Sequence, residues 1–281
     1  MINRHKRRLQ KLAKKGNISG YLVDEKNKTV MILTKDILTN QIYREGPNIA
    51  GSFDELGRGD INDCSEVFSR TLTMLVRHLP NVDDKGSEAT CARLLNSAAQ
   101  TYVAALEVAR RGYPREHGAL SRGIIETIST VLAIAMDGGG TLDKFHKGTL
   151  ETTKTIGLAK KALPFIGRLN GNLSNDFVHI GTLHDSVDGP KRYQKGDERF
   201  DFVITLSRLT VLLLDIVTEL IFSHEMESLR YWRRKGEGWV FEPGEETEKW
   251  MQSFVPEEKA SKSDGVTVQD IIGAFPATKT S

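Results

Sequence analysis

The sequence lacks several features that would assign it to a class at once. It has only two cysteines, Cys64 and Cys91, and both fall in helical patterns with apolar neighbours. Two such thiols predict reduced core residues rather than a disulfide framework, which favours a reducing compartment. The N-terminal basic stretch is not followed by an apolar run, so a secretory signal is not expected. The cytoplasm is therefore the expected location.

Uninterrupted apolar segments of membrane-spanning length are also missing. The most apolar stretch, 203–222, contains Arg208, Asp215 and Glu219. Because a helix that faces lipid does not readily accommodate three charges, we expect a buried helix and no membrane partner.

The familiar motifs of phosphate, nucleophile and metal chemistry are absent as well. Glycines 138–140 lack the Lys-Ser/Thr that completes a phosphate-binding loop, and no predicted strand precedes them. No Ser-centred nucleophile elbow occurs. Two histidines and two aspartates lie close together within 179–188, but their spacing fits no strong ligand pattern. We therefore expect neither a cofactor nor a metal ion.

What is present is the composition of a globular protein with a basic head. The 281 residues, 39% hydrophobic and 27% charged, suffice for one large domain with an appendage. Residues 1–16 carry basic side chains and no acid, which leaves the rest of the chain mildly acidic. The basic residues are Arg4, Lys6, Arg7, Arg8, Lys11, Lys14 and Lys15. This head could bind RNA, another nucleic acid or an acidic protein partner, and a solvated flexible arm is the alternative.

The order of predicted elements indicates a mostly α protein with a small N-terminal β segment. The expected parts are a basic head with a β-hairpin at 1–45, a linker at 46–60, a helical bundle domain at 61–236 and a polar, partly disordered tail at 237–281. The hairpin is expected over 20–34, where two β-prone runs flank a polar turn. The linker is inferred from Pro47 and the glycines around it.

Apolar residues at three- and four-residue steps predict the helices of the bundle. The helices are expected at 61–79, 87–111, 114–137, 141–149, 151–163, 172–180 and 198–234. Short connections between consecutive long helices favour an antiparallel arrangement.

The third of these helices contains one acid in an otherwise apolar run. From Gly123 to Met136 the only ionisable residue is Glu126, and Arg122 lies one turn before it. A helix that is apolar on nearly every face is usually central, so we expect an ion pair shielded from water. A surface pair is the alternative.

The last helix carries a polar stripe. Asp201, Arg208, Asp215 and Glu219 align on one face of a helix that is otherwise apolar. Either this stripe is the solvated face of the helix, or it meets another polar stripe inside the bundle.

The segment 172–180 combines an acid with an imidazole. Asp176 and His179 are three residues apart on the polar side of the predicted helix. A carboxylate at that spacing could orient the imidazole for acid–base chemistry. A structural hydrogen bond of the histidine is the alternative.

These residues carry a resemblance to a known family. Arg-x-x-x-Glu at 122–126, Leu-Ser-Asn-Asp-Phe-Val-His at 173–179 and a long final helix resemble the HEPN-like helical proteins of prokaryotes, especially members encoded near defence genes. The resemblance covers about 61–225. Many members are metal-independent ribonucleases, usually homodimers, in which an Arg holds the phosphate and a His moves the proton of the attacking 2′-hydroxyl. The resemblance implies as catalytic residues Arg122, Glu126, Asp176 and His179.

The chain departs from the family's motif, in which the Arg and the His are only a few residues apart. Arg111 and His117 come closest to that spacing, but Gly112 and Pro114 interrupt it. Two hypotheses follow. The first is a defence or toxin–antitoxin component that binds RNA and acts as a ribonuclease. The second is a non-catalytic binding or scaffold module of a nucleic-acid-associated assembly, in which buried polar residues fix helix pairing.

Overall fold

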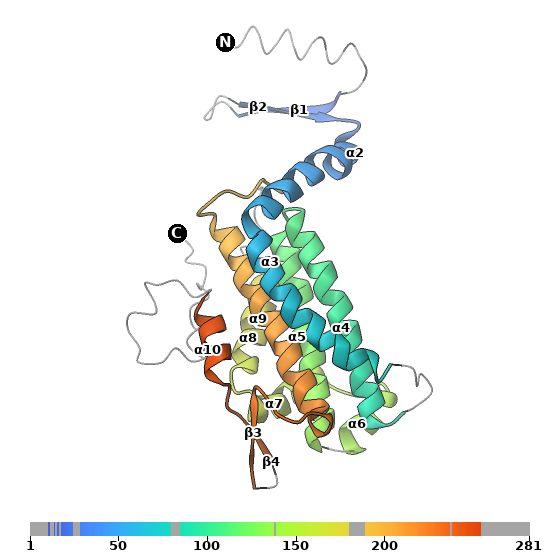
Figure 1. The fold of residues 1–281 in the computed structure, drawn as a ribbon. Coiled ribbons are helices and arrows are strands. Elements are labelled where there is room, and N and C mark those ends of the chain that lie inside the picture. Colours follow the sequence, from blue (N-terminus) through green and yellow to red (C-terminus); the bar gives the residue numbers. More distant parts are fainter. Residues whose placement is uncertain are drawn as a thin grey trace.

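The computed structural model describes residues 18–24, 29–79, 85–137, 139–179, 189–236 and 238–253, together with Lys11, Lys14 and Gly16. The elements are β1 (Ile18–Asp24), β2 (Thr29–Thr34), α2 (Ile37–Asn40), η1 (Gln41–Glu45), α3 (Gly46–Val76), α4 (Ser87–Arg110), α5 (Pro114–Asp137), α6 (Gly139–His146), α7 (Thr152–Ala162), α8 (Ile166–Leu173), η2 (Ser174–Val178), α9 (Glu198–Ile221), η4 (Ser223–Glu225), β3 (Trp232–Lys235), β4 (Gly238–Phe241) and α10 (Glu245–Gln252). The described part of the chain is mostly helical, as predicted (Figure 1).

The long helices α3, α4, α5 and α9 form a bundle (Figure 1). The first three alternate in direction, as their short connections predict. Helix α9 runs parallel to α3 and α5, because the shorter helices α6 to α8 return the chain before it begins. Accordingly, Phe53 near the start of α3 packs on Phe200 near the start of α9, and His78 just after α3 stacks on Phe222 just after α9.

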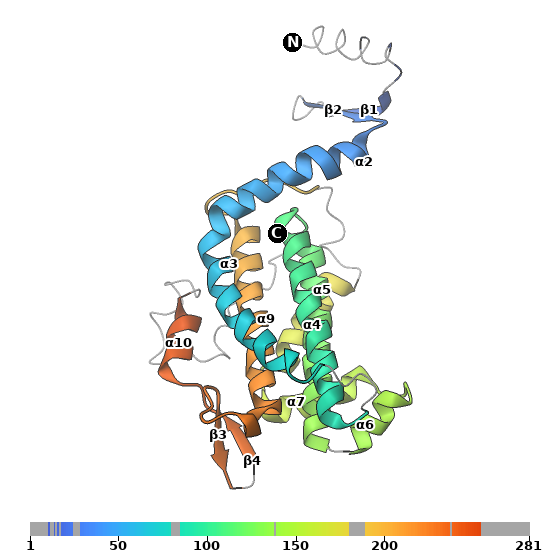
Figure 2. The ribbon, with the colours of Figure 1, turned by 45° about the vertical axis from the view of Figure 1, so that its right-hand side comes forward.

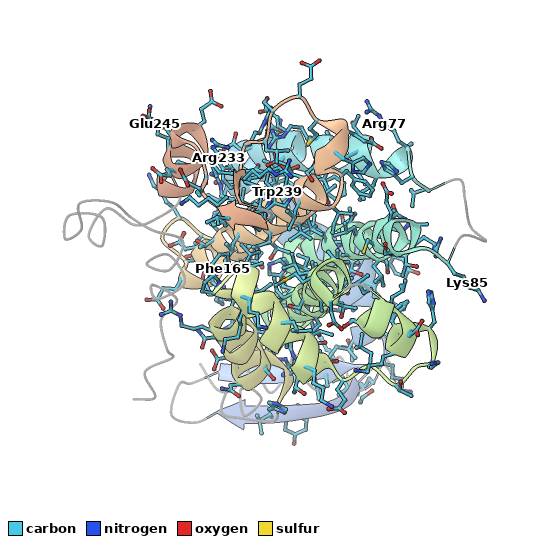
Figure 3. The ribbon with its side chains drawn as sticks, turned by 90° about the horizontal axis from the view of Figure 1, so that it is seen from below. Arg77, Lys85, Phe165, Arg233, Trp239 and Glu245 are labelled. Carbon is cyan, nitrogen blue, oxygen red and sulfur yellow. The ribbon has the colours of Figure 1, made fainter. Side chains whose placement is uncertain are left out.

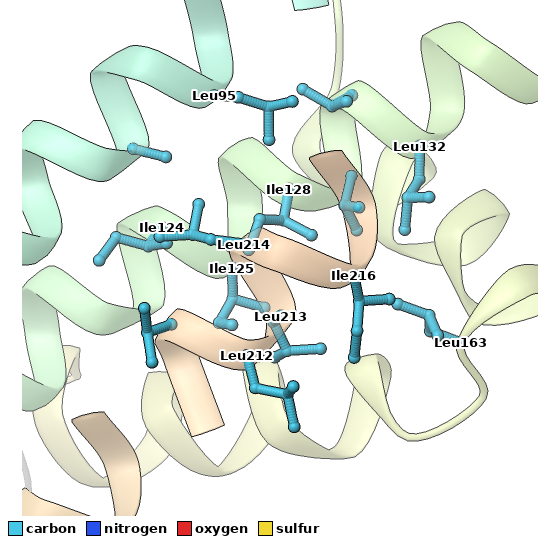
Figure 4. Close-up of a cluster of buried hydrophobic side chains, with 14 of the residues drawn as sticks. Leu95, Ile124, Ile125, Ile128, Leu132, Leu163, Leu212, Leu213, Leu214 and Ile216 are labelled. Carbon is cyan, nitrogen blue, oxygen red and sulfur yellow. The ribbon is translucent and has the colours of Figure 1, made fainter. Parts of the chain in front are cut away.

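Helix α5 lies at the centre of the bundle and packs against α4, α7, α8 and α9. Its Ile124, Ile125 and Ile128 are fully buried. Figure 4 shows them among leucines of α4 and α9, with Leu163 pointing toward Ile216. Because burying one such aliphatic side chain stabilises a fold by about 1.5–3 kcal/mol, this cluster is a major source of stability.

Among the described helices, α5 alone is long and apolar enough to cross a membrane by length and composition. Half of that stretch, 50%, is buried inside the protein. Packing against other helices on several sides accounts for its apolar character, as in the core helix of a soluble protein.

Residues 46–60 are not a linker, contrary to the prediction, because they form the first half of α3. Pro47 is compatible with this helix since it lies in the first turn of α3, where proline is well tolerated. Burial outweighs the low helix propensity of the glycines. Phe53 packs edge-to-face on Phe200, and a Cβ on Gly57 would stand 3.3 Å from the same ring. Gly57 therefore permits the close approach of α9 to α3 and does not mark a loop.

The predicted N-terminal hairpin is confirmed: β1 and β2 pair antiparallel, with Tyr21 opposite Ile32. Helices α2 and η1 join it to α3, and these elements project from the bundle as an arm (Figures 1 and 2). The arm exposes large apolar side chains, namely Tyr21, Leu22, Leu33, Ile37, Leu38, Ile42 and Tyr43. Most of the basic head lies outside the described residues, whereas Lys11 and Lys14 are helical and exposed.

The final helix is shorter than predicted, since α9 ends at Ile221 rather than near Arg234. The chain then turns back along the helix. The Glu219 carboxylate accepts the backbone N–H groups of Arg230 at 3.0 Å and Tyr231 at 2.8 Å. These hydrogen bonds hold the returning chain against α9.

A second hairpin, β3–β4, follows and was not predicted. Trp232 at its start is buried, and the indole N–H donates to the carbonyl of Ile216 at 2.8 Å. Helix α10 comes next, and the remainder of the predicted tail, 254–281, lies outside the described residues.

Candidate functional site

Arg122 and Glu126 form the ion pair that their spacing predicts. Arg122 Nη2 lies 2.6 Å from Glu126 Oε1, and the two side chains are 25% and 26% exposed. The pair therefore lies at the margin of the bundle, between the buried and the surface alternatives. Arg122 Nε is enclosed and has no hydrogen-bond partner among the described residues. This guanidinium retains an unsatisfied donor.

The second half of the predicted site follows α8. Here the chain makes one π-helical turn, η2, and leaves the helix at His179, which is extended. His179 is exposed, and its Nε2 lies 3.1 Å from the Ser174 hydroxyl. The π turn changes the expected register, so Ser174 rather than Asp176 is bonded to the imidazole. Partial burial raises the pKa of the Asp176 carboxyl.

Helix α5 and η2 pack against each other along a seam. One predicted residue pair lies on α5, and the other lies on η2 and directly after it. The ring of Phe177 lies directly on the backbone of Gly118, where an added Cβ would stand only 2.5 Å from Phe177 Cγ. Arg122 follows Gly118 by one turn on the same face of α5, and His179 follows Phe177 by two residues. Among the described residues, no hydrogen bond or ion pair joins Arg122 or Glu126 to Asp176 or His179.

The Arg111–His117 pair, which comes closest to the family spacing, is not available for chemistry. His117 is fully buried, with Nδ1 3.1 Å from the Ala105 carbonyl and Nε2 3.3 Å from the Ser207 hydroxyl. Burial lowers the pKa of this imidazole to about 4. His117 is a structural residue that links α4, α5 and α9.

The polar stripe of α9 meets another polar stripe inside the bundle. Arg208 is buried and pairs with Asp60 and Asp63 of α3 at 2.8 and 2.6 Å. Asp215 is also buried, whereas Asp201 at the start of the stripe is exposed. The stripe therefore lies inside the bundle rather than on a solvated face of the helix, except in the first turn of α9.

Asp215 is the centre of this internal network. Arg70 Nη2 lies 2.8 Å from Oδ2, the Thr71 hydroxyl donates to Oδ1 at 2.9 Å, and the Tyr231 hydroxyl donates to Oδ2 at 2.7 Å. Desolvation raises the pKa of Tyr231, and Asp215 raises it further. Tyr231 and Arg70 also line a pocket of about 390 Å³ that includes Arg233, which Figure 3 labels. The network ties α3, α9 and the C-terminal segment together.

Sequence reasoning found the α9 stripe but missed its partner. Asp63 and Arg70 on α3 are seven residues apart, as are Arg208 and Asp215 on α9. The two pairs have opposite signs in the same order, which is the pattern expected of two parallel helices in contact. That complementarity was the available signal.

The seven residues predicted to bind nucleic acid fall almost wholly outside the described residues. Only Lys11 and Lys14 are described, and both are exposed. Comparisons of the chain with protein-family models, with curated proteins and with solved structures give no match.

Proposed function

We propose that this protein is an HEPN-like, cytoplasmic component of a prokaryotic defence or toxin–antitoxin system that binds RNA and cleaves it without a metal ion. The observation that supports this proposal is the seam between α5 and η2. It is held by the contact of Phe177 with Gly118. Arg122 lies on α5 one turn after Gly118, and the exposed His179 directly follows η2.

The roles follow from the chemistry of each side chain. His179 accepts the proton of an RNA 2′-hydroxyl, and Arg122 binds the non-bridging oxygens of the adjacent phosphate. The 2′-oxygen then bonds to phosphorus as the bond to the 5′-oxygen breaks, and the leaving oxygen takes a proton from solvent, which gives a cyclic phosphate and a 5′-hydroxyl end. Glu126 positions Arg122, and phosphate must compete with this carboxylate for the guanidinium. A homodimer, as the resemblance implies, places two seams in one assembly.

The basic head supplies affinity in this proposal. Its cations neutralise phosphates along the RNA, and such contacts do not depend on sequence.

A second candidate function is a non-catalytic binding module of a nucleic-acid-associated assembly. It is favoured by the arm, on which Tyr43 is 75% exposed, Leu38 68% and Tyr21 64%. Large exposed apolar side chains gathered on one arm are typical of a protein-docking site. In this case the network around Asp215 fixes helix pairing, and the seam has no chemical role.

Incubation of the purified protein with total RNA, with and without chelator, separates the two functions. The ribonuclease proposal expects cleavage that persists in chelator and falls at least about 100-fold in His179→Ala, the loss typical of a missing general base. His146→Ala is the matched control, since His146 is also exposed. Equal cleavage by both variants removes the catalytic proposal. RNA binding without turnover favours the binding module.

A further inference from the structure

Two histidines and two glutamates from three segments meet at the end of the bundle opposite the seam. His78 follows α3, Glu88 lies in the first turn of α4, and His224 and Glu225 belong to the short helix η4 after α9. This is the end viewed in Figure 3, where Arg77 and Lys85 are labelled. His224 and Glu225 are far from His78 and Glu88 in sequence, so only the fold brings the two pairs together.

The potential ligand atoms of the cluster are close to one another. His78 Nε2 lies 3.3 Å from Glu225 Oε1, and His78 Nδ1 lies 3.7 Å from Glu88 Oε1. His224 Nε2 lies 3.5 Å from Glu88 Oε1 and 3.8 Å from Glu225 Oε1. One atom each from His78, Glu88 and Glu225 falls within 4.8 Å of the others.

His78 is held in place as a ligand would be. Its imidazole stacks on Phe222 with ring centroids 4.0 Å apart and planes 14° apart. Its Nε2 is enclosed, yet it has no hydrogen-bond partner among the described residues. The 3.3 Å approach to Glu225 is therefore close without the alignment of a hydrogen bond. A buried ring nitrogen that faces a carboxylate in this way is suited to share a cation with it.

We propose that His78, Glu88, His224 and Glu225 bind one divalent transition-metal ion of the Zn²⁺ class. Zn²⁺ binds imidazole nitrogen and carboxylate oxygen at about 2.0–2.2 Å, which separates tetrahedral ligand atoms by roughly 3.3–3.6 Å. A single ion takes one nitrogen of His78, and one ligand atom each of His78, Glu88 and Glu225 lies within 4.8 Å of the others. The exposed side chain of His224 joins them by rotating toward His78. Imidazole donors favour Zn²⁺ over Ca²⁺ and Mg²⁺, which prefer oxygen alone.

The metal ion joins the start of α4 to the segments that follow α3 and α9. Its role is structural, because it fixes the three segments at one end of the bundle, and it has no part in the proposed ribonuclease chemistry. The glutamates are 48% and 35% exposed and His224 is 61% exposed, so the ion reaches the site from solvent without unfolding. Chelation therefore lowers thermal stability while leaving RNA cleavage intact at moderate temperature.

Titration of the chelator-stripped full chain with Zn²⁺ against a chromophoric chelator tests the site. We expect one equivalent per chain, a weaker response to Mn²⁺ and none to Ca²⁺. Saturating Zn²⁺ at about a hundred times Kd should raise Tm by roughly 5–10 °C. Glu88→Gln and Glu225→Gln should each weaken Zn²⁺ binding at least about 10-fold. The double substitution His78→Gln and His224→Gln should abolish it.

Matched controls are Glu107→Gln, an exposed acid of α4, and His146→Gln, an exposed histidine whose ring nitrogen lies 3.1 Å from the Lys85 carbonyl. Both should bind Zn²⁺ as the unchanged chain does. No binding by the unchanged chain, or equal binding by the cluster variants and the controls, overturns the proposal. The two glutamine substitutions at partly exposed acids keep the test valid even if the double histidine variant fails to fold.

Discussion

Arg70 of α3 and Asp215 of α9 form an ion pair of 2.8 Å. It lies seven residues, or about two helical turns, along both helices from the pair of Asp63 with Arg208. Both acids and both arginines lie on the contact between the same two parallel helices. Asp215 is 3% exposed at its side chain, whereas Arg70 is 36% exposed. The network thus extends from the interior to the surface, and its buried end is the part that determines how α3 and α9 pair.

Replacing Asp215 by Ala should destabilise the fold strongly. The change leaves Thr71 and Tyr231 without their buried acceptor and Arg70 without its counterion. Breaking a buried pair on one side costs about 3–5 kcal/mol. Urea unfolding followed by circular dichroism measures the change. Asp201→Ala, at an exposed position of the same helix, should stay within about 0.5 kcal/mol of the unchanged chain.

Stability should fall between pH 6.5 and pH 4 because of His117. Its pKa is lowered to about 4 in the folded protein, so the unfolded chain binds the additional proton over this range. The stabilisation is complete above the unfolded pKa and is lost as the pH falls toward 4. Between pH 7 and pH 5 the loss from this residue is about 2 kcal/mol.

The variant His117→Gln isolates this contribution. Glutamine can keep a hydrogen bond to the Ala105 carbonyl but does not titrate. Urea unfolding at pH 7 and pH 5 should therefore show a smaller loss of stability in the variant than in the unchanged chain. An identical pH dependence of the two proteins would contradict the assignment of the effect to His117.

The sequence predicted α5 and most of the bundle because burial on several faces leaves a clear apolar pattern. It predicted the Arg122–Glu126 pair because that contact lies within one helix. The contacts that it missed all join distant segments. Examples are Asp215 with Tyr231 and His78 with Glu225. The spacing of residues within one helix does not predict such contacts. They can be predicted only when the polar stripes of two helices are compared.

Local sequence patterns also gave wrong predictions where packing outweighs local preference. The glycines of 46–60 indicate a loop by propensity, but Gly57 is needed where Phe200 lies against the helix. The His179 spacing indicated a helical Asp–His pair, but the π turn at 174–178 ends the regular helix and turns the imidazole to Ser174. In both cases tertiary contacts outweigh preferences of less than about 1 kcal/mol per residue.

RNA binding should depend on salt through the basic head. For single strands the logarithm of the binding constant falls by about 0.7 per phosphate contact for each tenfold rise in salt. Replacing the seven basic residues of 1–16 by Gln should therefore reduce the slope by as much as about 5. Filter binding of labelled RNA over a range of salt measures it. A slope that does not change shows that the head is only a solvated arm.

The contact of Phe177 with Gly118 provides the sharpest test of the seam. An alanine at 118 would place its Cβ 2.5 Å from the ring, so Phe177 and the η2 turn must move. Such overpacking costs about 1–3 kcal/mol. Gly123 is the matched control: it lies on the same helix, it is exposed, and an added Cβ there meets nothing within 4 Å. Gly123→Ala should instead stabilise the protein by about 0.5–1 kcal/mol.

The two glycine variants separate the seam's role in function from its role in stability. If His179 acts beside Arg122, Gly118→Ala should reduce the rate of RNA cleavage by much more than the loss of folded protein explains, because the displaced η2 turn moves the imidazole. Gly123→Ala should cleave at the unchanged rate. A Gly118→Ala protein that is less stable but fully active at temperatures where it stays folded would show that the seam is only a packing contact.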